Sequence, residues 1–207
     1  QKLDNIQHFY MQVDQRHRVD MLRKLAHVED FRGLVFFNSL SDLGSAEEKL
    51  QYRDILAVSL ASDVNVKFRK VILEKFKDKQ LTLLLATDLL ARGIDIEGVS
   101  HVINDAIPQD LSFFVHRVGR TGRNGLPGVA ITLYQPSDDS DIRELEKMGI
   151  RFVPKVLKNG VIEDTYDRDR RANREKKQEK LDIEMIGLVK KKKKKIKPGY
   201  KKKIKWA

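Results

Sequence analysis

Three arginines stand three residues apart in the segment His116–Arg123, which reads HRVGRTGR. The planar guanidinium group of arginine matches pairs of phosphate oxygens, so Arg117, Arg120 and Arg123 are suited to binding phosphate. Two glycines in the segment allow tight backbone turns, and we therefore expect the guanidinium groups to extend from a short loop. A solvated basic turn is the alternative for such a short stretch of arginine and glycine.

A second polar segment, Ala86–Ile96, follows a run of apolar residues that is typical of a buried strand. In open α/β sheets, functional loops lie at the carboxyl ends of the strands. The Thr87 hydroxyl is a donor for phosphate, Gly93 allows close approach of the backbone, and Asp95 is an acceptor for a sugar hydroxyl. The segment is therefore a candidate site for a ligand that carries phosphate and sugar.

The same segment has a purely structural interpretation that fits its residues equally well. In that interpretation Asp88 caps a helix that follows the strand, and Arg92 forms a local ion pair with Asp95. In the functional interpretation, Arg92 pairs with either acid and holds the loop rigid.

Alternating apolar and amphipathic segments surround both loops and predict strands buried between helices. The expected strands are Asn5–Val13, Gly33–Phe37, Asp54–Leu60, Thr82–Thr87, His101–Asn104 and Gly128–Tyr134. The expected helices are Arg16–Val28, Asp42–Gln51, Asn65–Lys77 and Ser137–Met148. This pattern predicts one open α/β domain with a mostly parallel sheet over residues 1–153. Residues 154–207 are expected to form a separate basic, RNA-binding tail that is largely disordered or partly helical, within which 155–166 either add one short strand or act as a linker.

Charge is distributed unevenly along the chain. Residues 1–166 contain 23 lysines and arginines against 24 acidic residues, a net charge of −1, whereas residues 167–207 contain 18 against 6, a net charge of +12. The tail includes six consecutive lysines, Lys190–Lys195, and a second cluster, Lys201–Lys203. Because the body is nearly neutral, its arginine cluster is not explained by a generally basic composition.

Composition also limits the class of protein. The 207 residues include no cysteine, which excludes disulfides and thiolate metal sites. No apolar run approaches the length of a membrane span, and the start, Gln1–Asp4, lacks the pattern of a signal peptide. We expect a cytoplasmic protein with no membrane partner and no metal site. The start at Gln1, without methionine, predicts a piece cut from a longer protein.

Taken together, the polar segments resemble the conserved motifs of the DEAD-box RNA helicases. Ala86–Ile96, Val102–Asn104 with Pro108, and His116–Arg123 resemble motifs V, Va and VI in the right order and spacing, and Leu34–Ser39 is similar to motif IV. Several linked matches are much less frequent by chance than one short pattern. The histidine at the head of the last segment favours the DEAD-box group over the related DEAH proteins, and the lysine-rich tail resembles bacterial members.

The resemblance covers about residues 1–150 and implies a RecA-like C-terminal domain, an open, mostly parallel sheet with helices on both faces, followed by the extended basic tail. In the family this domain is the second half of a two-domain ATPase. The first half carries the phosphate loop and the Asp-Glu-Ala-Asp box, which hold most of the ATP and its Mg²⁺, and neither pattern occurs in this chain. The resemblance therefore implies an enzyme whose N-terminal RecA-like domain is a partner of this chain, and the chain alone should be inactive.

The resemblance also implies roles for individual residues. Arg120 and Arg123 match the arginine fingers that reach the γ-phosphate of ATP and support catalysis, while Asp95 matches the acid that binds the ribose. Gly93 belongs to the same nucleotide-binding set. The positions implied to touch the RNA sugar-phosphate backbone are Asn38, Arg69, Thr87 and Gly93. The positions implied to organise the loops are Asp88, Arg92, His116 and Arg117.

The chain departs from the family pattern in two places. Where family members have Gln-x-x-Arg, this chain has Val66–Arg69, so the arginine is present without its polar companion. The usual Asn-Tyr-Asp-x-Pro is replaced by Asn104–Pro108, which has alanine at position 106 and places the acid, Asp105, one residue early. If the strand continues there, the shift turns this acid to the opposite face of the sheet.

The sequence is compatible with more than one role for the lysine-rich tail and more than one function for the chain. The tail is interpreted as an electrostatic tether for structured RNA, with Tyr200 and Trp206 available to stack on bases. A solvated end and a nuclear-import signal are the other possibilities. Structured or duplex RNA, such as ribosomal precursors or messenger RNA, is the expected substrate. The rival functions are an ATP-independent RNA-binding or annealing module and a DNA translocase of the same superfamily.

Overall fold

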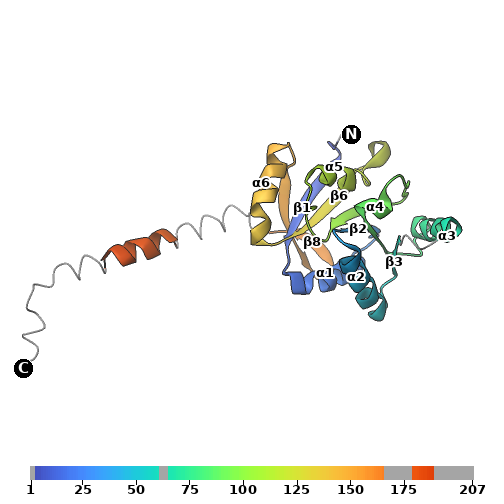
Figure 1. The fold of residues 1–207 in the computed structure, drawn as a ribbon, viewed down its shortest axis with the longest axis horizontal. Coiled ribbons are helices and arrows are strands. Elements are labelled where there is room, and N and C mark those ends of the chain that lie inside the picture. The colour runs from blue at the N-terminus through green and yellow to red at the C-terminus, as the bar shows by residue number, and fades with distance from the viewer. Residues whose placement is uncertain (1–2, 61–64, 166–178, 189–207) are drawn as a thin grey trace, which may run out of the picture. The chain divides into compact units, whose positions relative to one another are not determined.

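The computed structural model describes residues 3–60, 65–165 and 179–188 (Figure 1). The chain divides into a first unit, Gln1–Thr165, and a second unit, Tyr166–Ala207, in which the described residues 179–188 form a helix. The lysine clusters and the aromatic residues of the predicted tether lie outside the described residues. The first unit holds every predicted site residue of the body.

The first unit alternates strands with helices along the chain. Its strands are β1 (Ile6–Gln12), β2 (Gly33–Phe37), β3 (Ala57–Ser59), β4 (Leu83–Thr87), β5 (His101–Asn104), β6 (Gly128–Tyr134), β7 (Phe152–Lys158) and β8 (Val161–Asp164). Its α-helices are α1 (Arg18–Ala26), α2 (Leu40–Tyr52), α3 (Val66–Lys77), α4 (Asp88–Ala91), α5 (Ser112–Val118) and α6 (Asp139–Lys147). Short 3-10 helices cover Gln15–His17, Arg123–Gly125 and Pro136–Asp138.

The eight strands form one sheet in the order β3-β4-β2-β5-β6-β1-β7-β8. Every neighbouring pair is parallel except β7 and β8, which are antiparallel. All residues of the central strands β2 and β4 are buried, and because successive side chains point to opposite faces, both faces of the sheet are covered. The predicted mostly parallel sheet with helices on both faces is confirmed.

The parallel register brings three sequence-distant loops to one edge of the sheet. Phe37 at the end of β2 lies opposite Thr87 at the end of β4, and Phe36 lies opposite Asn104 at the end of β5. The residues that follow these strands therefore emerge side by side. Helix α5 reaches the same region because Phe114 and Val118 are fully buried in a second hydrophobic cluster with residues of α6.

Strands β7 and β8 extend the sheet beyond the last expected strand. The expected domain boundary at 153/154 falls within β7, which pairs with β1 in the register His8 with Phe152, and the first unit continues to Thr165. Asn159 and Gly160 both have positive φ, 50° and 75°, which is the conformation of a tight hairpin turn. Among the described residues up to 165, the structure shows a hairpin of two strands, β7 and β8, where one short strand or a linker was expected.

Candidate functional site

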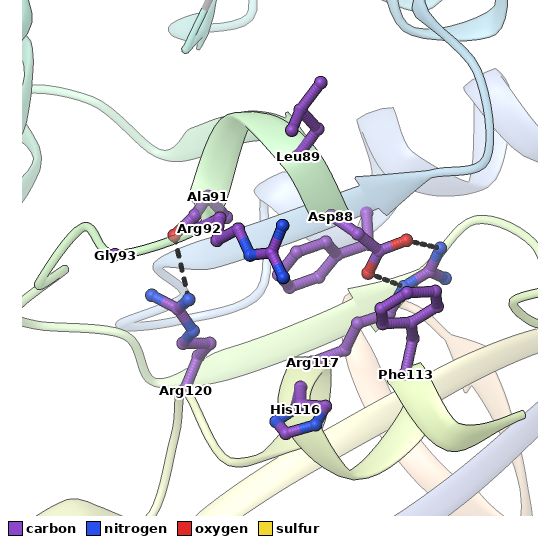
Figure 2. A pocket seen from close by; sticks show the side chains of 10 residues that line it. Asp88, Leu89, Ala91, Arg92, Gly93, Phe113, His116, Arg117 and Arg120 are labelled. Atoms are coloured by element: carbon purple, nitrogen blue, oxygen red, sulfur yellow. Dashed lines mark hydrogen bonds and ion pairs between the residues drawn. The ribbon is translucent and has the colours of Figure 1, made fainter. Parts of the chain in front are cut away.

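Arg117 is the centre of the site, and all five of its N–H groups are bound. Nε and Nη2 donate to the two carboxylate oxygens of Asp88, each at 2.8 Å (Figure 2). Nη2 also donates to Asn38 Oδ1 at 2.8 Å. Nη1 donates to the Ala106 carbonyl at 3.0 Å and to Asn104 Oδ1 at 3.4 Å. One side chain therefore connects the loops that follow β2, β4 and β5.

This connection is made away from water. The Arg117 side chain is 1% exposed, and its Cζ lies 5.3 Å from the centre of the Phe36 ring. Removing a guanidinium from water is costly, but a bidentate carboxylate and a complete set of acceptors offset that cost. The loop-organising role of Arg117 and Asp88 stays a prediction, and these contacts are the ones on which it rests.

Asn38 is held by the same network. Its Oδ1 accepts from Arg117, and its Nδ2 donates to the Ile107 carbonyl at 2.9 Å. The side chain thus joins the end of β2 to the loop after β5. Its contact with RNA stays a prediction, made by a side chain that already has two partners within the chain.

The arginine segment is only partly a loop. His116 and Arg117 lie in the last turn of α5, so the expectation that all the guanidinium groups extend from a short loop is wrong for Arg117. The buried anchors of α5 explain the difference, because the apolar residues before His116 continue the helix. After the helix, Gly122 adopts φ +65°, and Thr121 Oγ1 donates to the Val99 carbonyl at 3.1 Å. Arg120 therefore leaves the backbone from a turn that is itself held in place.

Both outer arginines contact the loop after β4. Arg120 Nη2 donates to the Ala91 carbonyl at 2.8 Å, and its Nη1 donates to the Ile94 carbonyl. Arg123 forms an ion pair with Asp95. Burial, and then the nearby charge of Arg123, lower the pKa of Arg120, while Asp95 opposes this shift. The structure thus brings the two predicted fingers and the predicted ribose acid together.

The start of α4 corrects one expectation about Asp88 and Arg92. Thr87, not Asp88, is the N-cap, because its Oγ1 accepts from the Leu90 N–H at 3.3 Å. In the part of the chain that the structure describes, Asp88 pairs with Arg117 and Asp95 pairs with Arg123, so Arg92 holds neither acid. The expected local ion pair is wrong because the acids find arginines from α5 and the turn after it.

A pocket of about 480 Å³ opens between α4 and α5 (Figure 2). Arg92, His116 and Arg120 supply its polar lining, and the exposed side chains of Leu89 and Phe113 supply apolar lining. Since the Asp88 carboxylate is matched by Arg117, the remaining guanidinium groups give the pocket a positive character.

Gly93 and Arg69 occupy different positions relative to this pocket. Gly93 lines it, has φ +71°, and has no heavy atom within 4 Å of the place that a Cβ would take. A ligand can therefore approach its backbone closely. Arg69 lies in the first turn of α3, outside the pocket lining, and its buried Nε has no partner among the described residues. Val66, which replaces the family's glutamine, is 80% exposed.

Asp105, the acid that stands one residue early, is buried. Its N–H donates to the Phe36 carbonyl at 3.0 Å, which continues the strand pairing, and its carboxylate lies 3.9 Å from Arg18 Nη1. Burial raises the pKa of Asp105 to about 6; Arg18 and Arg117 lower it and Asp42 raises it. Sequence reasoning missed Arg18, whose only signal is its place in the charged first turn of an expected helix.

Asp105→Asn is expected to change how stability depends on pH. The pKa of Asp105 in the folded protein is about 6, above the ordinary 3.8. Protonated Asp105 therefore adds its full contribution to the free energy of unfolding below pH 4, and this contribution is lost as pH rises through 6. The shift corresponds to about 3 kcal/mol at neutral pH. Urea unfolding of both proteins between pH 4 and 7.5 should show the wild type losing up to this amount relative to the variant. If the unfolding free energies of the two proteins change with pH in parallel, the raised pKa assigned to Asp105 is wrong. Glu163→Gln, at an exposed position, is the control.

Two further observations concern the described residues of the chain. None of their helices has the length and apolar character required to cross a membrane. No group of three or more histidine, aspartate or glutamate side chains in these same residues is placed to hold a metal ion.

The sheet order and the arginine-bearing edge define a RecA-like α/β domain. Residues 16–125 match the family model of the helicase conserved C-terminal domain, and the chain belongs to this family. It is 40% identical over 200 residues to the DEAD-box ATP-dependent RNA helicase CshB of Listeria monocytogenes, which covers 96% of this chain and 46% of that protein. The CshB of Bacillus subtilis is 41% identical over 180 residues, 87% of this chain and 41% of that protein. The chain therefore spans less than half the length of these relatives.

Solved structures show the same relationship. The C-terminal domain of the DEAD-box protein Dbp5 superimposes with a TM-score of 0.64 at 28% identity, covering 74% of this chain and 92% of that domain. A DEAD-box protein from Methanococcus jannaschii gives a TM-score of 0.64 at 31% identity, over 76% of this chain and 43% of that one. The chain corresponds to the C-terminal RecA-like domain of DEAD-box proteins.

Proposed function

We propose that this chain is the C-terminal half of an ATP-dependent RNA helicase that acts in the cytoplasm and locally opens RNA duplexes. The observation that carries the proposal is the network of Arg117. It joins the segments that resemble motifs IV, V, Va and VI at one sheet edge and leaves Arg120 and Arg123 at the rim. A preceding RecA-like domain would close on this edge with ATP between the two halves.

The rim fits the chemical groups of ATP. Two guanidinium groups and one carboxylate match the charge pattern of a triphosphate joined to a ribose, and the open side of Gly93 admits a ligand close to the backbone. Arg120 and Arg123 would neutralise charge that develops on the transferring phosphoryl group, and Asp95 would accept from the ribose hydroxyls. Bound Mg²⁺ would polarise the phosphate oxygens, and we assign its ligands to the preceding domain.

RNA would lie along the same edge and contact the chain through its sugar-phosphate backbone. The backbone at Gly93 lines the pocket, Thr87 precedes the lining residue Asp88 in the chain, and Arg69 and Asn38 are the other proposed contacts. Contacts of this kind position a strand without reading its bases, which suits an enzyme that acts on many structured RNAs, including ribosomal precursors and messenger RNA.

The test is the ATPase activity of this chain joined to a preceding domain, such as the N-terminal half of a CshB relative. ATP hydrolysis that RNA stimulates, and that DNA of equal length does not, supports the proposal. Equal stimulation by DNA would favour a translocase, and RNA annealing without any ATP dependence would favour a binding module. The isolated chain is the inactive control.

Removal of residues 187–207 tests the proposed tether. We expect weaker RNA binding and a flatter salt dependence, because each lost phosphate contact reduces the slope of log K against log salt by about 0.7 on a single strand. ATP hydrolysis without RNA should not change. A variant with Lys190–Lys195 replaced by glutamine keeps the length and isolates the effect of charge. Salt slopes equal to that of the full chain would refute the tether.

A further inference from the structure

The two rim arginines are held by different kinds of partner within the same loop. Arg120 donates to the backbone carbonyls of Ala91 and Ile94. Arg123 instead pairs with the side chain of Asp95, and this pair is accessible, with 40% of the Arg123 side chain and 69% of the Asp95 side chain exposed. Arg120 is therefore bound to the backbone of the loop, whereas Arg123 is bound to Asp95, the carboxylate that the proposed function assigns to the ribose.

The carbonyl contacts of Arg120 do not compete with a nucleotide. They use one N–H of each terminal nitrogen, so three of its five N–H groups have no partner among the described residues. The carbonyls belong to the backbone of the loop, and a triphosphate has no donor with which to displace the guanidinium from them. Arg120 can therefore meet phosphate oxygens while it keeps both contacts, and it needs little reorganisation.

The contact of Arg123 does compete with a nucleotide. Ribose hydroxyls that donate to Asp95 Oδ1 compete with Arg123 Nη1, which contacts this same oxygen. Because an exposed ion pair contributes little free energy, hydroxyl donors can compete with the guanidinium for this oxygen. The displaced Arg123 is then free for the phosphate end of the same ligand.

We propose that Asp95 couples recognition of the ribose to the release of Arg123. Arg123 would reach the phosphates only after the ribose hydroxyls replace it on Asp95, and we call this exchange the gate. Arg120 would be in position to reach the phosphates before the nucleotide binds. This inference rests on the proposed function and adds to it a source of specificity. The hydroxyls of the sugar would affect the chemical step through Arg123, in addition to their effect on nucleotide binding.

The test compares ATP with 2′,3′-dideoxy-ATP in the two-domain protein at saturating nucleotide. We expect the loss of kcat caused by Arg123→Ala to be about threefold to fivefold smaller with the dideoxy nucleotide, because Asp95 still holds part of the Arg123 population. Arg120→Ala is the matched control, and its loss of kcat should be the same with both nucleotides within about twofold, since its contacts are to backbone.

A spectroscopic measurement tests the gate without hydrolysis. The Arg123 guanidinium Nε–H signal in NMR spectra of the 207-residue chain should shift in Asp95→Asn, while the Arg120 signal stays in place. In the two-domain protein, a non-hydrolysable ATP analogue should move the Arg123 signal, and its 2′,3′-dideoxy form should move it less. An Arg123 signal that does not respond to Asp95→Asn would overturn the gate.

The outcomes separate the gate from the proposed function. If Arg123→Ala costs the same with both nucleotides, the gate is wrong and the finger assignment stands. If Arg123→Ala costs nothing with ATP, the finger assignment itself is wrong.

Discussion

Replacement of Arg117 with alanine is expected to destabilise the first unit by about 3 kcal/mol, because it removes a buried guanidinium and leaves the partly exposed Asp88 carboxylate without its partner. The oxygens of Asn38, Asn104 and Ala106 lose a donor at the same time, and unmatched buried acceptors add to the cost. Urea unfolding of the 207-residue chain measures the effect. Arg143→Ala, which breaks an exposed pair with Asp139, is the control and should change stability by less than about 0.5 kcal/mol.

Two further variants distinguish the charge network from simple packing. Arg117→Lys keeps the charge but cannot make the bidentate contact with Asp88, so it should remain strongly destabilised. The double variant Arg117→Met with Asp88→Leu removes both charges and should recover part of the lost stability. A loss of less than about 1 kcal/mol in Arg117→Ala would show that the network does not hold the three loops together.

Replacement of either proposed finger is expected to reduce RNA-stimulated ATP hydrolysis by the two-domain protein at least about 10²-fold. The physical reason is the loss of a guanidinium that neutralises charge on the transferring phosphoryl group. The measurement is kcat for Arg120→Ala and for Arg123→Ala, with Arg143→Ala, in helix α6, as the control. Activity within about threefold of the wild type would refute the finger assignment.

The unfolding free energy separates chemistry from structure in these variants. Arg120 also bridges the carbonyls of Ala91 and Ile94, so Arg120→Ala should lose some stability of the loop as well as activity. Within the described residues, the contact of the Arg123 side chain is an exposed ion pair with Asp95, so Arg123→Ala should lose activity with little change in stability. If the loss of kcat in a variant is fully explained by its loss of unfolding free energy, the replaced arginine has a structural role and is not a finger.

Much of the sheet was predictable because its strands are continuous apolar runs. Strands His101–Asn104 and Gly128–Tyr134 have the expected bounds, and Gly33–Phe37 does as well. Strand β7 was harder to predict, because Pro154 and two lysines interrupt its apolar pattern. Helices α4 and α5 span four and seven residues, which is too short for a helical period to appear in the sequence.

The sequence by itself determined the parallel α/β class and the set of residues that resemble the helicase motifs, since composition and local spacing carry both. It did not determine which charges pair. Local spacing favours Arg92 as the partner of the nearby acids, whereas the structure pairs Asp88 with Arg117, 29 residues away, and Asp95 with Arg123. Only the tertiary structure decides this, because parallel strands bring their carboxyl ends to one edge and α5 carries a buried arginine into the space between them.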